Sequence, residues 1–92
     1  MPVEVRVPSV LRALVAGARM VEGRGATVSQ LIDDLERRYP GMRGRLLSAS
    51  GELYQFVNIY INDEDIRFLR QLETPVAEGD VISILPALAG GG

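Results

Sequence analysis

The sequence predicts an α+β domain, in which a mixed sheet of four to five strands has one main helix packed on one face. Segments of alternating apolar and polar residues, typical of strands, lie near both ends of the chain. An amphipathic helix separates them. A length of 92 residues suits one domain. We expect the first and last strands to lie side by side in the middle of the sheet.

The first part of the chain predicts two strands. In "VEVRV", residues 3–7, valines alternate with charged residues, as in a strand with one buried face. Pro8 ends this strand because proline has no backbone N–H. Residues 9–16 are interpreted as a connection. "GARMVEG", residues 17–23, is interpreted as a second strand bounded by glycines.

The helix has clear start and stop signals. Thr27 followed three residues later by Gln30 forms a capping-box pattern, and Pro40-Gly41 stops the helix. Between these signals, apolar residues at helical spacing predict one buried stripe. The stripe consists of Val28, Leu31, Ile32, Leu35 and Tyr39.

Charged residues also lie on this helix. Asp33 and Asp34 precede Arg37 and Arg38 by four residues, a spacing that stabilises a helix modestly. We interpret this run as a solvated helix face, because such pairs are common on surfaces. A docking face is the alternative.

The second half of the chain predicts a turn of helix near 42–47 and three further strands. "LYQFVNIYIND", residues 53–63, alternates apolar and polar residues like the first strand. "IRFL", residues 66–69, is interpreted as a short strand. "DVISIL", residues 80–85, is almost continuously apolar, which is typical of a central strand.

The stretch "NDED", residues 62–65, is predicted to be a turn and not a metal site. A calcium loop needs alternating ligands, a glycine and a distal glutamate, and this stretch lacks that spacing. Asparagine and aspartate favour turns for backbone reasons. We therefore predict no metal site in this chain.

The residue types that are missing restrict the chemistry of the chain. It contains no Cys, His, Lys or Trp, and all ten of its basic residues are arginine. Thiolate, imidazole and Schiff-base catalysis are therefore excluded, and arginine stays protonated at neutral pH. We predict that the protein is not itself an enzyme.

Charge and hydropathy indicate which partners and locations to expect. The net charge of −2 argues against nucleic acid and against an anionic membrane surface as partners. The first residues alternate and do not form the apolar run of a signal peptide. We expect a cytoplasmic protein that is a monomer when free.

The chain finishes on "LPALAGGG", residues 85–92, and final glycines add nothing to a core. We therefore predict a folded domain, 1–86, and a flexible C-terminal tail, 87–92, which would reach roughly 20 Å when extended. Its reactive group is the α-carboxylate of Gly92, which is ionised and inert until another protein activates it. A disordered end without function is the alternative.

The last strand predicts a partner-binding surface. If its isoleucines face the helix, Val81 and Leu85 face away and form an apolar site beside the tail. Leu88 and Phe68 complete the predicted partner-binding set. Cover of both sheet faces by loops is the alternative.

The predicted order of elements with a glycine pair near the end resembles the ubiquitin-like, or β-grasp, fold. "FVNIYINDEDIRFL" (56–69) and "VISILPALAGG" (81–91) resemble the small bacterial sulfur carrier proteins. That family includes the molybdopterin synthase small subunit and the sulfur carrier of the thiamine pathway. The chain most resembles the thiocarboxylate carrier of cysteine biosynthesis, over essentially its whole length.

The resemblance implies a mechanism in which other proteins perform the catalysis. A ubiquitin-activating-type enzyme uses ATP to adenylate the terminal glycine, and a sulfur donor converts the adenylate to a thiocarboxylate. A pyridoxal-phosphate (PLP) cysteine synthase accepts the sulfur, and a metal-dependent peptidase releases the product. This chain itself binds no cofactor. Molybdopterin synthesis, or attachment to other proteins as a ubiquitin-like modifier, is the alternative.

The resemblance assigns function only to the terminal glycines. Gly90 and Gly91 match the family's glycine pair, and Gly92 is one residue more. Either Gly92 is the activated residue, or it is trimmed first, or it is an addition to the natural chain. The extra residue moves the carboxylate by roughly 3.8 Å.

Overall fold

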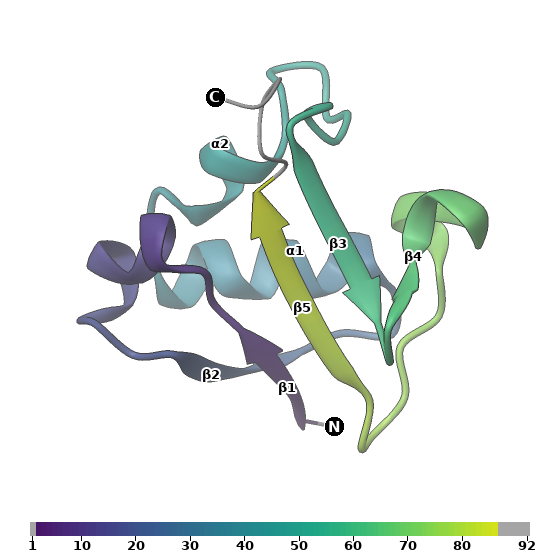
Figure 1. The fold of residues 1–92 in the computed structure, drawn as a ribbon, viewed down its shortest axis with the longest axis horizontal. Helices are drawn as coiled ribbons and strands as arrows, with labels where there is room; N and C mark the ends of the chain where they lie inside the picture. The colour runs from purple at the N-terminus through teal and green to yellow at the C-terminus, as the bar shows by residue number, and fades with distance from the viewer. Residues whose placement is uncertain (1, 87–92) are drawn as a thin grey trace.

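The computed structural model describes residues 2–86, which form one five-stranded sheet in the order β2-β1-β5-β3-β4 (Figure 1). β1 and β5 are parallel, and the other neighbouring strands are antiparallel. The predicted α+β architecture and the central pairing of the first and last strands are confirmed. The strands are β1 (Pro2–Arg6), β2 (Met20–Arg24), β3 (Val57–Ile61), β4 (Glu64–Asp65) and β5 (Val81–Pro86). The helices are α1 (Val28–Arg38), α2 (Met42–Leu46) and the 3-10 helices η1 (Ser9–Val15), η2 (Ile66–Phe68) and η3 (Gln71–Glu73).

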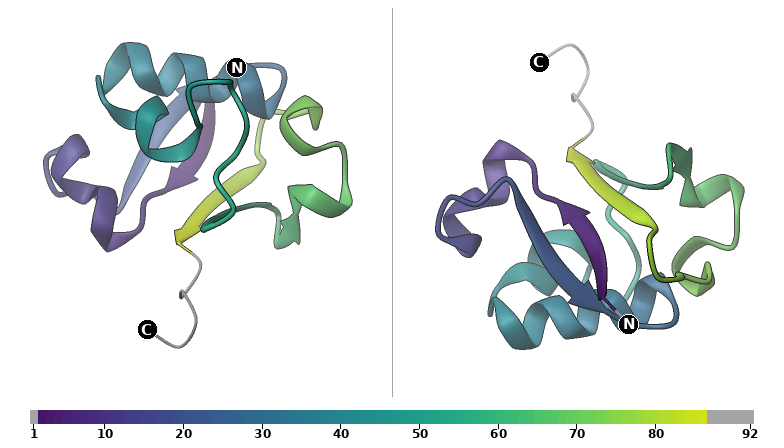
Figure 2. Two further views of the ribbon diagram at one scale, coloured as in Figure 1. Left: turned by 90° about the horizontal axis from the view of Figure 1, so that it is seen from above. Right: turned by 90° about the horizontal axis from the view of Figure 1, so that it is seen from below.

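The core lies between one face of the sheet and α1. Alternate residues of the central strands, such as Val5, Ile59 and Ile82, are buried in one cluster with Leu31 and Leu35 of α1. Burying each large aliphatic side chain stabilises the fold by about 1.5–3 kcal/mol. The start of β1 and the end of β5 lie at opposite ends of the sheet because the two strands run parallel (Figure 2).

The start of α1 confirms the predicted cap. Thr27 Oγ1 accepts a hydrogen bond from the Gln30 backbone N at 3.2 Å. Gln30 Oε1 accepts one from the Ala26 backbone N at 2.9 Å, one residue earlier than in the usual capping box. At Gly25 a Cβ atom would lie 2.5 Å from the backbone N of Leu31, so only glycine lets the chain pass this close to the helix.

Residues 9–16 are not a simple connection, and this prediction was wrong. Ser9–Val15 form η1, which buries Leu11 and Val15 against the core. The second strand also begins later than predicted, at Met20, because Ala16 and Gly17 have positive φ angles of 56° and 83° and form a turn. The helical turn predicted near 42–47 is confirmed as α2.

The predicted strand at 66–69 was also wrong. The short strand that pairs with β3 is Glu64–Asp65, and η2 follows at once. Asp65 starts η2 because its Oδ1 accepts a hydrogen bond from the Arg67 backbone N at 2.8 Å. The turn predicted at 62–65 is confirmed for Asn62 and Asp63, which have positive φ angles of 49° and 72°, but Glu64 and Asp65 form β4.

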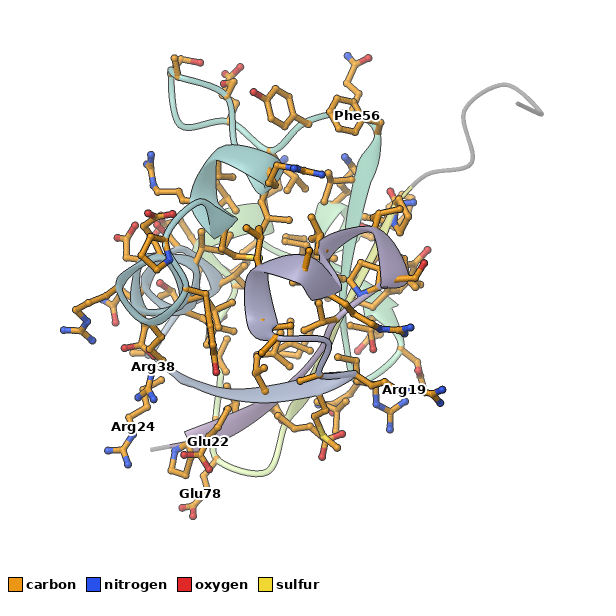
Figure 3. The ribbon with its side chains drawn as sticks, turned by 90° about the vertical axis from the view of Figure 1, so that its left-hand side faces the viewer. Arg19, Glu22, Arg24, Arg38, Phe56 and Glu78 are labelled. Carbon is orange, nitrogen blue, oxygen red and sulfur yellow. The ribbon has the colours of Figure 1, made fainter. Side chains whose placement is uncertain are left out.

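The prediction of a solvated helix face was wrong for Asp34. It is only 5% exposed, and its carboxylate accepts hydrogen bonds from Arg37, from Arg38 Nε at 2.8 Å and from the Arg24 backbone N at 2.8 Å. Arg24 and Arg38 lie near each other beside α1 (Figure 3). The carboxylate therefore joins the end of β2 to the helix, whereas the neighbouring Asp33 is exposed.

The pKa of Asp34 gives this contact a pH dependence. Burial raises the pKa, but the hydrogen bonds from the two arginines and the strand N–H outweigh burial, so the pKa lies below its usual value of 3.8. A carboxyl whose pKa is lowered by folding stabilises the fold at pH values above its usual pKa. That contribution is lost as the pH falls through 3.8 and below it.

Replacing Asp34 with alanine is expected to lower the free energy of unfolding by about 1–3 kcal/mol at pH 7, because the partly buried Arg24 N–H and the two arginine side chains lose their acceptor. Urea denaturation at pH 7 and pH 3 measures this loss, and the gap between variant and parent should narrow at pH 3. Asp33→Ala is the control and should change stability by less than about 0.5 kcal/mol. Equal losses from the two variants would contradict the assignment.

Candidate functional site

The candidate site lies at the C-terminal end of β5, which is the central strand of the sheet. Ile82 and Ile84 are 2% and 3% exposed and face the core, whereas Leu85 is 47% exposed on the opposite face. The pairing of β5 with β3 continues through the last residue of the strand, since Pro86 is the register partner of Val57. The strand therefore fixes the position from which residues 87–92 begin. The alternative that loops cover both sheet faces is excluded at Leu85.

Arg67 supports this end of the sheet. Its Nη1 donates to Asn58 Oδ1 at 2.7 Å, and its Nη2 donates to the backbone O of Val57 at 2.8 Å and of Tyr54 at 3.0 Å. Asn58 is the register partner of Leu85. The guanidinium thus holds the start of β3 beside the end of β5. Arg67 was not predicted from the sequence, because nothing in "IRFL" indicates that its side chain bonds to the start of β3.

A basic groove adjoins Leu85 on the open face of the sheet. The groove has a volume of about 510 Å³, and three arginines from separate segments line it. Arg12 is positioned by a hydrogen bond from its Nε to the Val7 backbone O at 3.1 Å. The basic groove combines positive charge with apolar surface. Its lining includes Arg6, Arg12, Arg19, Met20, Pro8 and Leu85, and the carboxylate of Asp63 is the one acidic group among the lining residues. The arginines are distant in sequence, so their convergence was not predicted.

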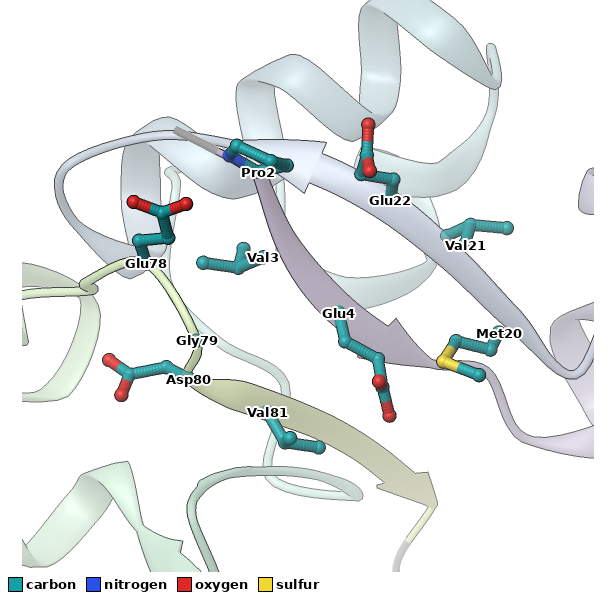
Figure 4. Close-up of a pocket in the computed structure, with 10 residues that line it drawn as sticks. All are labelled: Pro2, Val3, Glu4, Met20, Val21, Glu22, Glu78, Gly79, Asp80 and Val81. Atoms are coloured by element: carbon teal, nitrogen blue, oxygen red, sulfur yellow. The ribbon is translucent and has the colours of Figure 1, made fainter.

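An acidic groove lies at the other end of the same face (Figure 4). It has a volume of about 560 Å³ and surrounds Val81, and its carboxylates are those of Glu4, Glu22, Glu78 and Asp80. Asp80 is held in place by hydrogen bonds from Asn62 Nδ2 and the Ala77 backbone N, both at 2.8 Å. The open face therefore changes from acidic at the start of β5 to basic at its end.

The structure separates the predicted partner-binding residues. Val81 and Leu85 share a face, but four strand residues place them about 13 Å apart, in different grooves. Phe68 is 86% exposed on η2 and lines neither groove. Leu88 and the predicted sulfur-carrying residues, Gly90, Gly91 and Gly92, lie outside the described residues.

Residues 2–86 offer neither a metal-binding cluster nor a membrane-spanning helix. They contain no group of three His, Cys, Asp or Glu side chains that could hold a metal ion. Within the same range, every helix is too short or too polar to cross a membrane.

Comparison with known families decides between the classes of protein that share this architecture. The sequence model of the ThiS family matches residues 5–91, which include the first two terminal glycines. The chain belongs to the ThiS family. The ubiquitin-like β-grasp fold predicted from the sequence is confirmed by its structural neighbours.

Relatives of this ThiS-family chain include the sulfur carrier protein CysO of Mycobacterium tuberculosis, which is 47% identical over 93 residues. The match covers 99% of this chain and all of CysO. CysO in the crystal structure of the Amycolatopsis orientalis BexX/CysO complex is also 47% identical, with a TM-score of 0.90. That match covers 97% of this chain and 99% of the other. The predicted function class, a sulfur carrier, is therefore confirmed.

A more distant relative represents the second carrier type. The molybdopterin synthase sulfur carrier subunit of Phaeosphaeria nodorum is 36% identical over 61 residues. The match covers 66% of this chain and 60% of the subunit. The relation to molybdopterin carriers is thus confirmed at the family level, and the CysO type is the better supported of the two.

Proposed function

We propose that this protein carries sulfur as a thiocarboxylate on its C-terminal glycine and donates it for cysteine biosynthesis. The observation that carries the proposal is the 47% identity to CysO over the whole of both chains. The match of the family model through Gly91 adds support, since it includes the glycine pair that such carriers use.

Loading takes place in two steps. The terminal carboxylate attacks the α-phosphorus of ATP, which releases pyrophosphate and leaves an acyl adenylate. Sulfide (HS⁻) then attacks the acyl carbon, AMP leaves, and loss of the S–H proton gives the thiocarboxylate. A carboxylate is a poor acyl donor without activation, so the protein acts as a co-substrate and not as a catalyst.

The partners supply the groups that this chain lacks. ATP belongs to a ubiquitin-activating-type enzyme, PLP to the cysteine synthase that accepts the sulfur, and a metal ion to the peptidase that releases the product. A thiocarboxylate is anionic at neutral pH and needs no base to be nucleophilic, which suits a chain without Cys, His or Lys. We propose that the protein works in the cytoplasm.

We propose that the activating enzyme docks on the basic groove around Leu85, next to the point where the chain leaves β5. A half-exposed leucine beside three arginines suits a partner that presents an apolar side chain among carboxylates. Val81 and Phe68 lie farther from this point and would serve as secondary contacts. Leu88 belongs to the segment that enters the partner.

Intact-mass measurement tests the proposal. Incubation with a CysO-type activating enzyme, ATP and sulfide is expected to raise the mass by the difference between sulfur and oxygen, and omission of ATP should prevent the change. Exposure of the loaded protein to a PLP cysteine synthase and an activated serine should then add the amino acid. No mass change with any activating enzyme would overturn the carrier function. Stable adducts on other proteins in cells would instead indicate a modifier.

A further inference from the structure

A second surface at the end of β5 is apolar and lies on the core side of the sheet. It is a small pocket of about 120 Å³ between η1, α2 and the ends of β3 and β5. Its floor is built from buried core residues, including Leu11, Leu46 and Ile84. Arg45 lies on its rim. We call this hollow the end pocket. It shares Pro8 and Ile84 with the lining of the basic groove and no residue with the lining of the acidic groove.

Two exposed apolar side chains flank the end pocket. Val10 from η1 is 58% exposed, and Phe56 before β3 is 53% exposed and stacks on Tyr54 with ring centroids 4.8 Å apart. Phe56 lies at the same end of the molecule as the end of β5 (Figure 3). Adjacent exposed apolar residues from distant parts of the sequence indicate a surface that something covers.

The described chain ends on the wall of this pocket. Pro86 is the last described residue and is itself a lining residue. Side chains alternate along a strand, and residues 82 and 84 of β5 face the core side. If the strand continued past Pro86 with the same alternation, residue 88 would lie on the side of the end pocket.

Residue 88 is a leucine, and it has the largest apolar side chain in the segment 87–92. Two residues span at most about 7 Å, so Leu88 can reach the pocket beside Pro86. An apolar cavity of about 150 Å³ in another protein takes up a benzene molecule, which makes 120 Å³ suitable for one leucine side chain. The reach of the chain, the face of the strand and the volume of the pocket therefore all indicate Leu88 as the occupant.

We propose that the end pocket binds the side chain of Leu88 from the protein's own C-terminal segment. Only Ala89 to Gly92 then extends beyond the anchor, which sets the terminal group about 14 Å from the pocket at most. Burial of one leucine and the ordering of two residues nearly cancel in free energy. A partner can therefore withdraw Leu88 when it draws the chain end into its own channel.

Nuclear magnetic resonance of the full chain with labelled leucine methyl groups tests this proposal. We expect nuclear Overhauser effects between the Leu88 methyl groups and the Phe56 ring, and an upfield shift of those methyl signals. Leu88→Ala should shift the signals of Phe56 and Val10 and give Ala89 the fast backbone motion of a chain end. Leu85→Ala is the matched control, because residue 85 faces the other side, and it should leave the Leu88–Phe56 contact in place.

A variant in the wall of the end pocket, Phe56→Ala, provides a second test of the proposal. Phe56→Ala changes a half-exposed side chain, and it should remove the upfield shift of Leu88 while the core signals remain. The proposal is overturned if Leu88 gives no contact to Phe56 and has the methyl shifts of an isolated peptide of residues 85–92. In that case the end pocket is left for a partner's side chain. None of these readouts depends on sulfur loading, so this test and the test of the carrier function fail independently.

Discussion

Deletion of Gly91 and Gly92 is expected to abolish thiocarboxylate loading and to leave the stability of the domain unchanged. In the proposed mechanism the adenylating enzyme places the terminal carboxylate against ATP, and removal of two residues takes that carboxylate out of reach. Misplacement of a reacting atom by as little as 1 Å can lower a rate by about a hundredfold. The core of residues 2–86 is built from side chains between Val3 and Ile84, so the deletion removes none of it.

Intact mass after incubation with the enzyme, ATP and sulfide measures loading, and thermal unfolding measures stability. Deletion of Gly92 alone is the decisive companion variant, because it leaves the Gly90–Gly91 pair of the family at the end of the chain. Full loading of this shorter variant would show that Gly92 is dispensable, and loss of loading would assign the reaction to Gly92. A large drop in melting temperature after removal of both glycines would contradict the prediction that they serve in loading and not in folding stability.

The fold was predictable wherever a periodic pattern coincided with burial. The valines of β1, the stripe of α1 and the isoleucines of β3 and β5 all repeat with the period of their element. Burial confirms each one except Tyr39, which is only partly buried and follows the last residue of α1. Thr27 and Gln30 marked the helix start correctly because a cap depends on residues close in sequence. Signals of this kind involve residues that are close in sequence, so they can be recognised without knowledge of tertiary contacts.

The failures occurred where tertiary contacts decide the local structure. "VLRALV" forms a 3-10 helix because Leu11 and Val15 both reach the core, and so short an apolar run does not reveal this. "IRFL" has the composition of a strand, yet the Asp65 cap and the bonds of Arg67 to β3 turn it into η2. Burial of Asp34 depends on the Arg24 backbone ten residues away.

The geometry of the candidate site was only partly predictable. The outward direction of Leu85 follows from strand alternation and is confirmed by its exposure, whereas the role of the terminal glycines stays a prediction. The division of the open face into an acidic and a basic groove could not be predicted, because Arg6, Arg12 and Arg19 come together only when η1 is folded beside β1. The end pocket is missed for the same reason, since four separate segments form it.

Leu85→Asp is expected to weaken binding to the adenylating enzyme by about 2 kcal/mol or more, which is about a thirtyfold rise in Kd. An apolar side chain at the centre of a desolvated contact carries much of the binding energy, and a new carboxylate would oppose the acidic partner that the basic groove attracts. Leu85 is 47% exposed, so the loss of folding stability should stay at about 1 kcal/mol or less. Calorimetric titration gives Kd, and urea denaturation gives the stability of the same samples.

Leu69→Asp provides the matched control for this prediction. Leu69 is 38% exposed and lines neither the basic nor the acidic groove, so the same substitution there adds the same charge away from the proposed contact. It should leave Kd within about threefold, since peripheral residues contribute little to binding energy. Equal weakening by both variants would mean that net charge, and not the groove, governs recognition. Unchanged binding of Leu85→Asp would place the docking surface elsewhere on the sheet.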